Sequence, residues 1–202
     1  MEVVFQSFID GNNELYFMDH YGSNPTRITT NSSSDRNATW AHDGTKVAFE
    51  TDRDGNDEIY FSDLPDTSHI TQILENGFED SAPRWSHDGT KVAFESLRDG
   101  NWEIFTMNPD GTNLTNVTNN ASIDGNVSWS PDGTKIVFHT YRDGNWEIYT
   151  MNADGTNPTR ITNSFWIEVW PHWSPDGNKI TFTTNQAGNF EIYTMNTDGT
   201  NQ

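Results

Sequence analysis

Short apolar runs separated by turn-forming residues repeat along the whole chain. In one stretch these runs cover residues 127–129, 135–140, 146–151 and 158–162, and they are rich in Val, Ile, Phe, Tyr, Trp and Thr. Such residues favour strands, and no stretch keeps the 3.6-residue period of an amphipathic helix. The pattern therefore predicts an all-β protein with four short strands in each repeating unit.

Four tryptophans mark the repeat, because Trp40, Trp85, Trp129 and Trp173 lie 45, 44 and 44 residues apart. They open the phrases WAHDGTKVAF, WSHDGTKVAF, WSPDGTKIVF and WSPDGNKITF. A second phrase follows in phase as DGNNELY, DGNDEIY, DGNWEIF, DGNWEIY and AGNFEIY. The recurring Asp-Gly pairs suit tight hairpin turns. Four strands in each unit of this length indicate a β-propeller with one sheet per blade.

We name the strands of a blade A, the innermost, to D, the outermost. When the phrases are aligned, the first residues of the chain fall inside strand B and the last residues fall just before strand D. The sequence thus predicts one propeller domain over residues 1–202, with about five four-stranded blade units, the first lacking strand A and the last lacking strand D. The units cover approximately residues 1–37, 38–81, 82–125, 126–169 and 170–202.

The two incomplete blades leave two interpretations open. In one, the sequence is a segment of a longer propeller. In the other, the free strand edges are completed by another chain, either a second copy in self-association or a strand of a partner, because free edges offer unpaired backbone donors and acceptors.

These phrases resemble the repeat of the TolB-type (WD40-like) β-propeller family, with the pattern WSPDGxKIAF, then RDGNxEIY, then MNxDGxNxxRLT. The units opened by Trp129 and Trp173 match almost residue by residue, and the likeness covers nearly the entire chain. The resemblance implies a propeller that docks protein partners in a bacterial envelope, so we expect a periplasmic or extracellular location. Such a repeat identifies a scaffold better than an activity.

Composition narrows the classes of partner. Eleven Lys and Arg against 30 Asp and Glu give a net charge of −19. This charge argues against nucleic acid and against an anionic membrane face, and it favours basic proteins or peptides. Cysteine is absent, so disulfides and thiolate metal sites are excluded. No apolar run approaches the ~20 residues of a membrane span, and the first residues lack the features of a signal peptide.

One carboxylate stands five residues before each tryptophan of the repeat. We expect these acids to lie around one mouth of the central channel and to contact partners. Carboxylate oxygens are also ligands that Ca²⁺ prefers, so a calcium site is a second interpretation. In a third, each acid hydrogen-bonds backbone amides of its own or the next loop. The acids are Asp35, Asp80, Asp124 and Glu168.

The run FWIEVW differs most from the corresponding loops, which read NASIDGNV and ENGFEDSA. Exposed aromatic patches commonly mark contact sites, so we predict that Phe165, Trp166 and Trp170, with the neighbouring His172, bind a partner. Other aromatics stand where strand C begins, and they either pack between blades or stack on sugar rings. These are Trp102, Trp146 and Phe190.

Two further features of the repeat suggest contacts. Arginines precede the Asp-Gly-Asn turns and glutamates follow them, which predicts ion pairs across each hairpin. The arginines are Arg53, Arg98 and Arg142, and the glutamates are Glu58, Glu103 and Glu147. His139 aligns on strand B with Gln6, Glu50, Glu95 and Thr183. That register predicts a polar band between blades.

No catalytic constellation is evident, because the sequence lacks a nucleophile elbow, a phosphate-binding glycine loop and an HExxH motif. We therefore assign no catalytic residue and expect no cofactor, with Ca²⁺ as the single candidate ion. The favoured function is a non-catalytic binding or scaffold module for protein or peptide partners. The alternatives are a glycan-binding or polysaccharide-degrading propeller, and a purely architectural segment of a larger or oligomeric propeller.

Overall fold

Turn chemistry divides the chain into short antiparallel strands. In the turn of the phrase WSPDGTK, Gly133 adopts φ +69° and its N–H donates to the carbonyl of Ser130, 2.9 Å away. The Asp132 carboxylate accepts hydrogen bonds from the Thr134 N–H and the Ser130 hydroxyl. This conformation favours glycine, which explains the Asp-Gly pair at each such turn.

The computed structural model describes residues 2–9, 11–64, 68–74 and 76–202, and over these residues it contains five antiparallel sheets and no helix. We number the sheets as blades 1 to 5. Blade 1 consists of β1 (Glu2–Ser7), β2 (Glu14–Asp19) and β3 (Thr26–Arg27). Blade 2 consists of β4 (Asp35–Trp40), β5 (Lys46–Thr51), β6 (Glu58–Asp63) and β7 (Ile70–Gln72). Blade 3 consists of β8 (Asp80–Trp85), β9 (Val92–Ser96), β10 (Glu103–Met107) and β11 (Thr115–Asn116).

Blade 4 repeats the four-stranded pattern and blade 5 has three strands. Blade 4 consists of β12 (Asp124–Trp129), β13 (Lys135–Thr140), β14 (Glu147–Asn152) and β15 (Thr159–Arg160). Blade 5 consists of β16 (Glu168–Trp173), β17 (Lys179–Thr184) and β18 (Glu191–Asn196). In each sheet the strands pair in chain order. The predicted all-β propeller, with strand A absent from blade 1 and strand D absent from blade 5, is confirmed.

The predicted strand bounds were wrong at strands A and D. In blade 4, strand A begins at Asp124 rather than at residue 127, because a β-bulge between Gly125 and Ser128 lets the pairing continue towards the N-terminus. Strand D is only the pair Thr159–Arg160, since just these two residues pair with β14. Strand B was predicted with its observed bounds.

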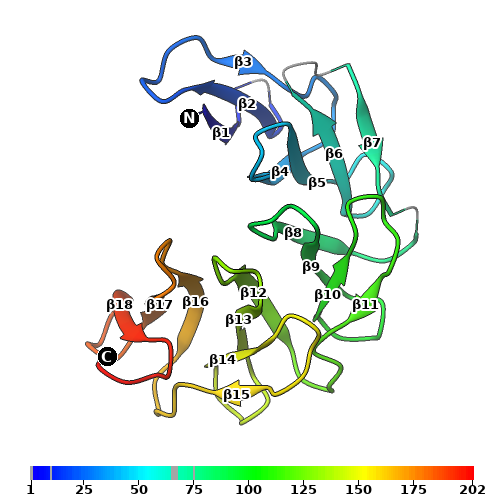
Figure 1. Cartoon of the computed structure of the whole chain (residues 1–202). Coiled ribbons are helices and arrows are strands. Elements are labelled where there is room, and N and C mark those ends of the chain that lie inside the picture. The colour runs from blue at the N-terminus through cyan, green and yellow to red at the C-terminus, as the bar shows by residue number, and fades with distance from the viewer. Residues whose placement is uncertain (1, 10, 65–67, 75) are drawn as a thin grey trace.

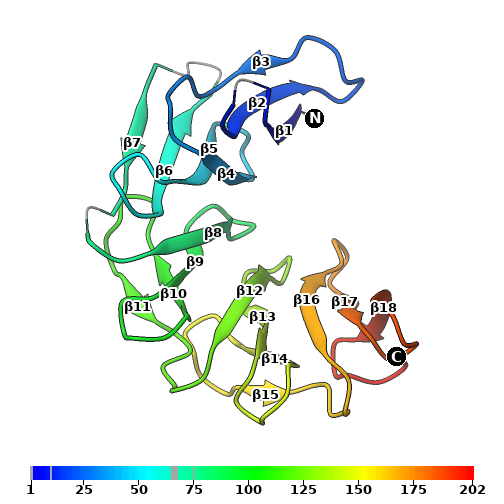
Figure 2. The ribbon, with the colours of Figure 1, turned by 180° about the vertical axis from the view of Figure 1, so that it is seen from behind.

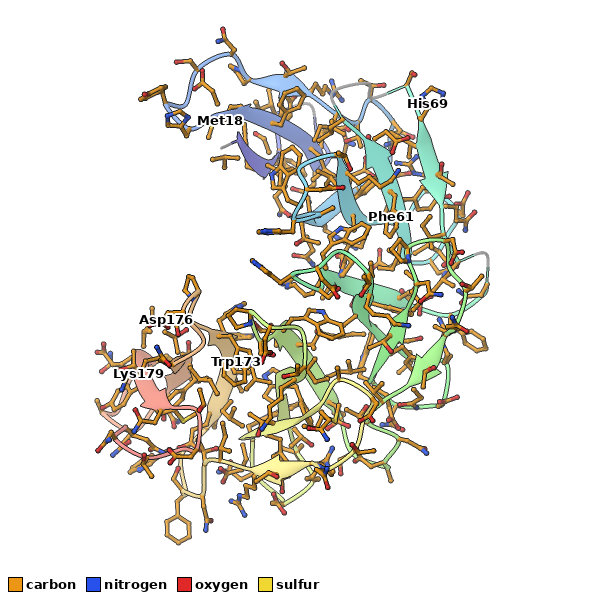
Figure 3. All side chains as sticks on the ribbon, in the orientation of Figure 1. Met18, Phe61, His69, Trp173, Asp176 and Lys179 are labelled. Atoms are coloured by element: carbon orange, nitrogen blue, oxygen red, sulfur yellow. The ribbon has the colours of Figure 1, made fainter. Side chains whose placement is uncertain are left out.

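The blades are arranged around a common axis in an open arc, with β8, β12 and β16 on its inner side and β7, β11 and β15 on its outer side (Figures 1 and 2). Met18 on β2 and Trp173 on β16 label the two sheets that face the opening (Figure 3). Within the described residues, the strands of blade 1 make no contact with those of blade 5. The described residues contain no helix, and so no helix long and apolar enough to cross a membrane.

Each inner blade is buried on both faces, so its strands are nearly continuous in apolar residues. On β13, Ile136 and Phe138 belong to an apolar cluster that includes Ala93 of blade 3, whereas Val137 belongs to a cluster that includes Ile180 of blade 5. Successive residues of a strand point to opposite faces of the sheet. The core is therefore a series of apolar layers between blades rather than one central cluster.

Blades 4 and 5 contain the same hexapeptide, EIYTMN, in β14 and in β18. In β14 it is covered by blade 5, and the side chain of Ile148 is 0% exposed. In β18 no described residue covers the equivalent face, and Ile192 is 79% exposed. The local sequence is identical, so the difference in exposure comes from the neighbouring blade and the outer strand β15, which cover β14 alone.

This pair gives a matched test of the arc. Ile148→Ala should lower the free energy of unfolding by about 2–5 kcal/mol, because it leaves a cavity in a buried layer. Ile192→Ala should change it by no more than about 0.5 kcal/mol, as expected of an exposed site. Urea denaturation of both variants measures the difference. Equal destabilisation by the two substitutions would contradict the open arrangement.

Candidate functional site

The first three predicted acids lie inside the blade junctions rather than on a surface. Each begins strand A of its blade and is 0% exposed. An arginine from the turn between strands B and C of the same blade pairs with it, and an asparagine four residues earlier donates to it. The ion pairs are Arg53 with Asp35 at 3.0 Å, Arg98 with Asp80 at 2.9 Å, and Arg142 with Asp124 at 3.2 Å. The amide donors are Asn31, Asn76 and Asn120.

The predicted ion pairs across the hairpins were therefore wrong, because these arginines reach back to strand A. The guanidinium also lies over aromatic rings of strands B and C: in blade 4, Arg142 is 4.8 Å from the ring centroid of Tyr149 and 5.5 Å from that of Phe138. A planar cation that meets a buried carboxylate and two rings holds three strands together. We assign these acids to the framework that positions the loops.

The fourth acid, Glu168, lacks this support. Gln186 stands where the other blades have arginine, and Ser164 stands where they have asparagine. Glu168 is 1% exposed, its Oε1 accepts from the Ser164 hydroxyl at 2.8 Å, and its Oε2 has no hydrogen-bond partner among the described residues. Burial, together with the nearby Glu147 carboxylate, raises the pKa of Glu168 to about 7.

A second carboxylate, at the start of strand C, lies at each junction. Burial raises the pKa of Glu58 to about 7, with a contribution from Asp80. Burial alone would also raise the pKa of Glu14, but hydrogen bonds from Thr29 and Asn12 and the Arg27 guanidinium lower it below its ordinary value. The protonation of these buried acids therefore depends on how many cations and donors each junction supplies.

The described residues contain no group of three or more His, Asp or Glu side chains placed to hold a metal ion. The junction acids Asp35, Asp80 and Asp124 are also occupied by their arginine partners. A hard cation such as Ca²⁺ needs several oxygen ligands around one point. The calcium site therefore stays a prediction from the sequence.

The loop between β15 and β16 presents the predicted aromatic side chains. Phe165 is fully exposed, and Trp166 and Trp170 are 43% and 51% exposed. The Trp170 ring lies 6.4 Å from that of Phe190, which is also exposed. His172 is exposed on β16, and burial of part of its ring, with the Arg84 charge, lowers its pKa. Phe165 and Trp166 thus lie in the loop that enters blade 5, and Trp170 and His172 lie on β16.

The backbone of this loop is held firmly while its aromatic side chains extend outward. The side-chain amide of Asn145 donates to the carbonyls of Ser164, at 3.2 Å, and Trp166, at 2.6 Å. The Trp166 N–H donates to the Ser164 hydroxyl at 3.0 Å, and the Ile167 N–H donates to the Asn185 side chain at 2.8 Å. A partner that binds these side chains would have little loop entropy to overcome.

The strand B position of His139 carries a hydrogen-bond acceptor in each of the first four blades. In each junction a strand B side chain accepts the N–H of the bulge residue on strand A of the next blade. The bulge residues all have positive φ, between 50° and 54°. The pairs are Gln6 with Asn37, Glu50 with Ala82, Glu95 with Asn126, and His139 with Trp170. The predicted polar band between blades is present, and its last link fixes the backbone of Trp170.

Of the aromatics at the start of strand C, Trp102 and Trp146 are partly buried, as the packing interpretation expects, whereas Phe190 is exposed. The Trp146 ring lies 4.7 Å from the His139 ring and 5.4 Å from the Tyr141 ring. One further feature, which the sequence analysis does not predict, is a pocket of about 510 Å³ lined by Trp40, Trp85, His42 and His87, the two imidazole rings lying 3.8 Å apart and tilted. Pro131 and Pro175 stand at the aligned positions of the later repeats.

Comparison with known proteins is consistent with this geometry. The family described as TolB beta propeller domain matches residues 66–157 and 140–202, which together make up more than half of the chain. The structure is similar to TolB from Acinetobacter baumannii, with a TM-score of 0.83 and 23% identity, over 96% of this chain and 49% of that chain. The chain thus spans about half of that protein's length. No curated protein matches the sequence significantly.

Two further solved structures share the fold. A protein assigned as TolB in Agrobacterium tumefaciens has a TM-score of 0.80 and 27% identity, over 94% of this chain and 73% of that chain. An oligogalacturonate lyase in complex with manganese has a TM-score of 0.75 and 15% identity, over 98% of this chain and 60% of that chain. The same scaffold therefore occurs in proteins with and without an enzymatic name.

Glu168 generates a prediction for alkaline pH. Its folded pKa, about 7, exceeds the ordinary value of 4.5, so its stabilising contribution is complete below pH 4.5 and is lost as the pH rises through 7. Glu168→Gln should therefore leave the free energy of unfolding unchanged at pH 5 and raise it by about 2 kcal/mol at pH 8. Denaturation at both pH values measures this. Asp124→Asn, which removes an arginine's partner, should instead destabilise at pH 8.

His139 generates the opposite prediction for acid pH. Burial lowers its folded pKa from 6.5 to about 4, so its contribution is complete above pH 6.5 and is lost as the pH falls through 4. His139→Gln keeps an acceptor, as Gln6 does, without titrating, and should resist acid by about 2–3 kcal/mol more than the wild type. His139→Leu should be less stable throughout. An acid profile for His139→Gln identical to that of the wild type would refute this role.

Proposed function

The chain belongs to the TolB β-propeller domain family, and from this premise we propose that it is a non-catalytic binding module for protein or peptide partners of basic character. One observation carries the proposal: Phe165 and Trp166 are exposed on a loop whose backbone is fixed by hydrogen bonds, and Trp170 is exposed on β16, the strand that this loop enters. By likeness to TolB, its setting is the bacterial envelope or the extracellular space.

Charge supports a basic partner. The net charge of −19 repels anions and attracts cations at long range, so it speeds the encounter with a basic surface. At short range the aromatic rings supply apolar area and stack with arginine side chains. Because the four junction acids are buried, they support the loops, and the exposed acids of the turns produce the field near the partner.

A glycan-binding role is the second candidate, and Tyr141 favours it. This side chain is 46% exposed and meets the Trp146 ring edge-on, so the Tyr141 ring is held in place and offers a face to a sugar ring. The same net charge would repel a polyanionic chain such as a polygalacturonate. A neutral oligosaccharide that quenches tryptophan fluorescence, with loss of the effect in Tyr141→Ala, would favour this candidate over the first.

Selection of a random peptide library on the immobilised full chain tests the first candidate. The enriched peptides should carry net positive charge. Their affinity, measured by calorimetry, should fall at least about tenfold for the double variant Phe165→Ala/Trp166→Ala, because loss of a central aromatic contact costs more than about 1 kcal/mol.

Phe78→Ala provides the matched control, because Phe78 is an exposed aromatic in the corresponding loop before β8. Its removal should leave the affinity within about twofold of the wild type. Enrichment of acidic peptides, or an equal loss in the control, would refute the proposed function.

A further inference from the structure

Blades 2, 3 and 4 each surround an arginine side chain with the same kinds of group. The guanidinium forms an ion pair with a buried carboxylate of strand A, donates through Nε to a hydroxyl at the end of strand B, and lies over two aromatic rings. In blade 4, Arg142 meets Asp124, Thr140, with Nε 3.1 Å from Oγ1, and the rings of Phe138 and Tyr149. The same place is occupied in blades 2 and 3 by Arg53 and Arg98. This set of groups is therefore a binding site for one guanidinium.

Blade 5 keeps these groups and lacks the arginine. Glu168 stands at the position of the carboxylate and Thr184 at that of the hydroxyl, and they are 1% and 0% exposed. The rings of Phe182 and Tyr193 lie 6.0 Å apart, as the equivalent rings of blade 4 do, and belong to the apolar layer between blades 4 and 5. Gln186 replaces the arginine and is exposed, and its one hydrogen bond to a described residue is made by its backbone N–H. The site thus faces blade 4 and involves neither end of the arc.

No cation within the described residues takes the place of this arginine beside Glu168. The Glu168 Oε2 is buried and accepts no hydrogen bond from a described residue. The nearby Glu147 carboxylate accepts from the Arg160 guanidinium at 2.5 Å and from the Thr162 hydroxyl at 2.7 Å, so this arginine is already paired. A buried carboxylate without a cation either takes up a proton, as the raised pKa of Glu168 allows, or binds a cation from outside.

A guanidinium from outside can reach this site. The equivalent arginine side chains of blades 2, 3 and 4 are 22%, 12% and 19% exposed, so each such site opens to solvent on one side. The turn of blade 5 is also smaller, because Ala187 stands where blade 4 has Asp143. The Ser164 hydroxyl that donates to Glu168 also accepts the Trp166 N–H. The site therefore adjoins the exposed aromatic loop.

We propose that the junction between blades 4 and 5 binds the guanidinium group of an arginine side chain from a partner protein, between Glu168 and the rings of Phe182 and Tyr193. The planar cation pairs with the carboxylate, donates to the Thr184 hydroxyl and stacks on the rings, as the chain's own arginines do in the other blades. Lysine is a poorer ligand, because its compact, strongly hydrated ammonium lacks the planar fork. This inference rests on the proposed function, for which it specifies arginine as the basic residue recognised.

N-acetylarginine amide tests the proposal through the melting temperature of the full chain at pH 8, above the Glu168 pKa of about 7. At about 50 mM it should raise the melting temperature by at least about 2 °C more than N-acetyllysine amide does at the same ionic strength, because a ligand of the folded chain stabilises it. Gln186→Arg supplies the guanidinium within the chain and should abolish this difference. Gln186→Ala, at the same exposed position, is the matched control and should retain it.

Two further variants locate the bound guanidinium. Glu168→Gln removes the charge of the carboxylate at nearly constant size and should lose the response. Arg142→Gln recreates the blade 5 arrangement in blade 4, so it should melt at a lower temperature and respond more strongly to the arginine derivative than the wild type does.

The proposal would be overturned by equal responses of the wild type to the arginine and lysine derivatives, or by a response that persists in Glu168→Gln or in Gln186→Arg. The peptides selected on the full chain separate this result from the proposed function. If they lose affinity in Phe165→Ala/Trp166→Ala and bind Gln186→Arg as tightly as the wild type, the proposed function stands and only this inference fails.

Discussion

A blade of this protein is stable only where another layer covers each of its apolar faces. Val137 and Phe138 are neighbours on one strand, and they pack against different blades. Covering both faces is a requirement of every sheet whose strands are apolar throughout. The arc meets it for three blades and leaves one face uncovered at each end, where Val3 and Ile192 are exposed. The apolar side chains that pack between the inner blades are thus exposed where they recur on the outer faces of blades 1 and 5.

Buried charge is the second element of each junction, and its arrangement follows from the cost of desolvation. A carboxylate such as Asp80 is buried together with Arg98 and Asn76, whose charge and hydrogen bond offset the cost of removing it from water. Where the arginine is replaced, as at Gln186, the acid takes up a proton more readily. The junction between blades 4 and 5 therefore differs in chemistry from the others, although its backbone is the same.

The sequence predicted the fold well because period and turn residues are local signals. The 44-residue spacing and the Asp-Gly turns were sufficient to predict the three-stranded end blades. The burial of the acids was harder to predict, since Asp35 is buried against Arg53, which lies in the turn between two other strands. A signal was nevertheless present. Asp35, Asp80 and Asp124 are each followed by arginine 18 residues later, whereas Glu168 is followed by Gln186. A paired change of this kind within repeats marks a contact.

The residues that differ from the repeat lie at the junction between blades 4 and 5, and we therefore propose the binding surface at this junction. The His139 ring accepts the N–H of Trp170, Ser164 hydrogen-bonds both Glu168 and Trp166, and the loop they support carries the exposed aromatics. In a repeat protein the common residues maintain the scaffold, so selectivity for a ligand has to come from residues that differ. Glu168 and His139 are each the only member of their aligned position with that side chain. These two differences between the repeats change the chemistry next to the aromatic loop and leave the apolar layers between the other blades unchanged.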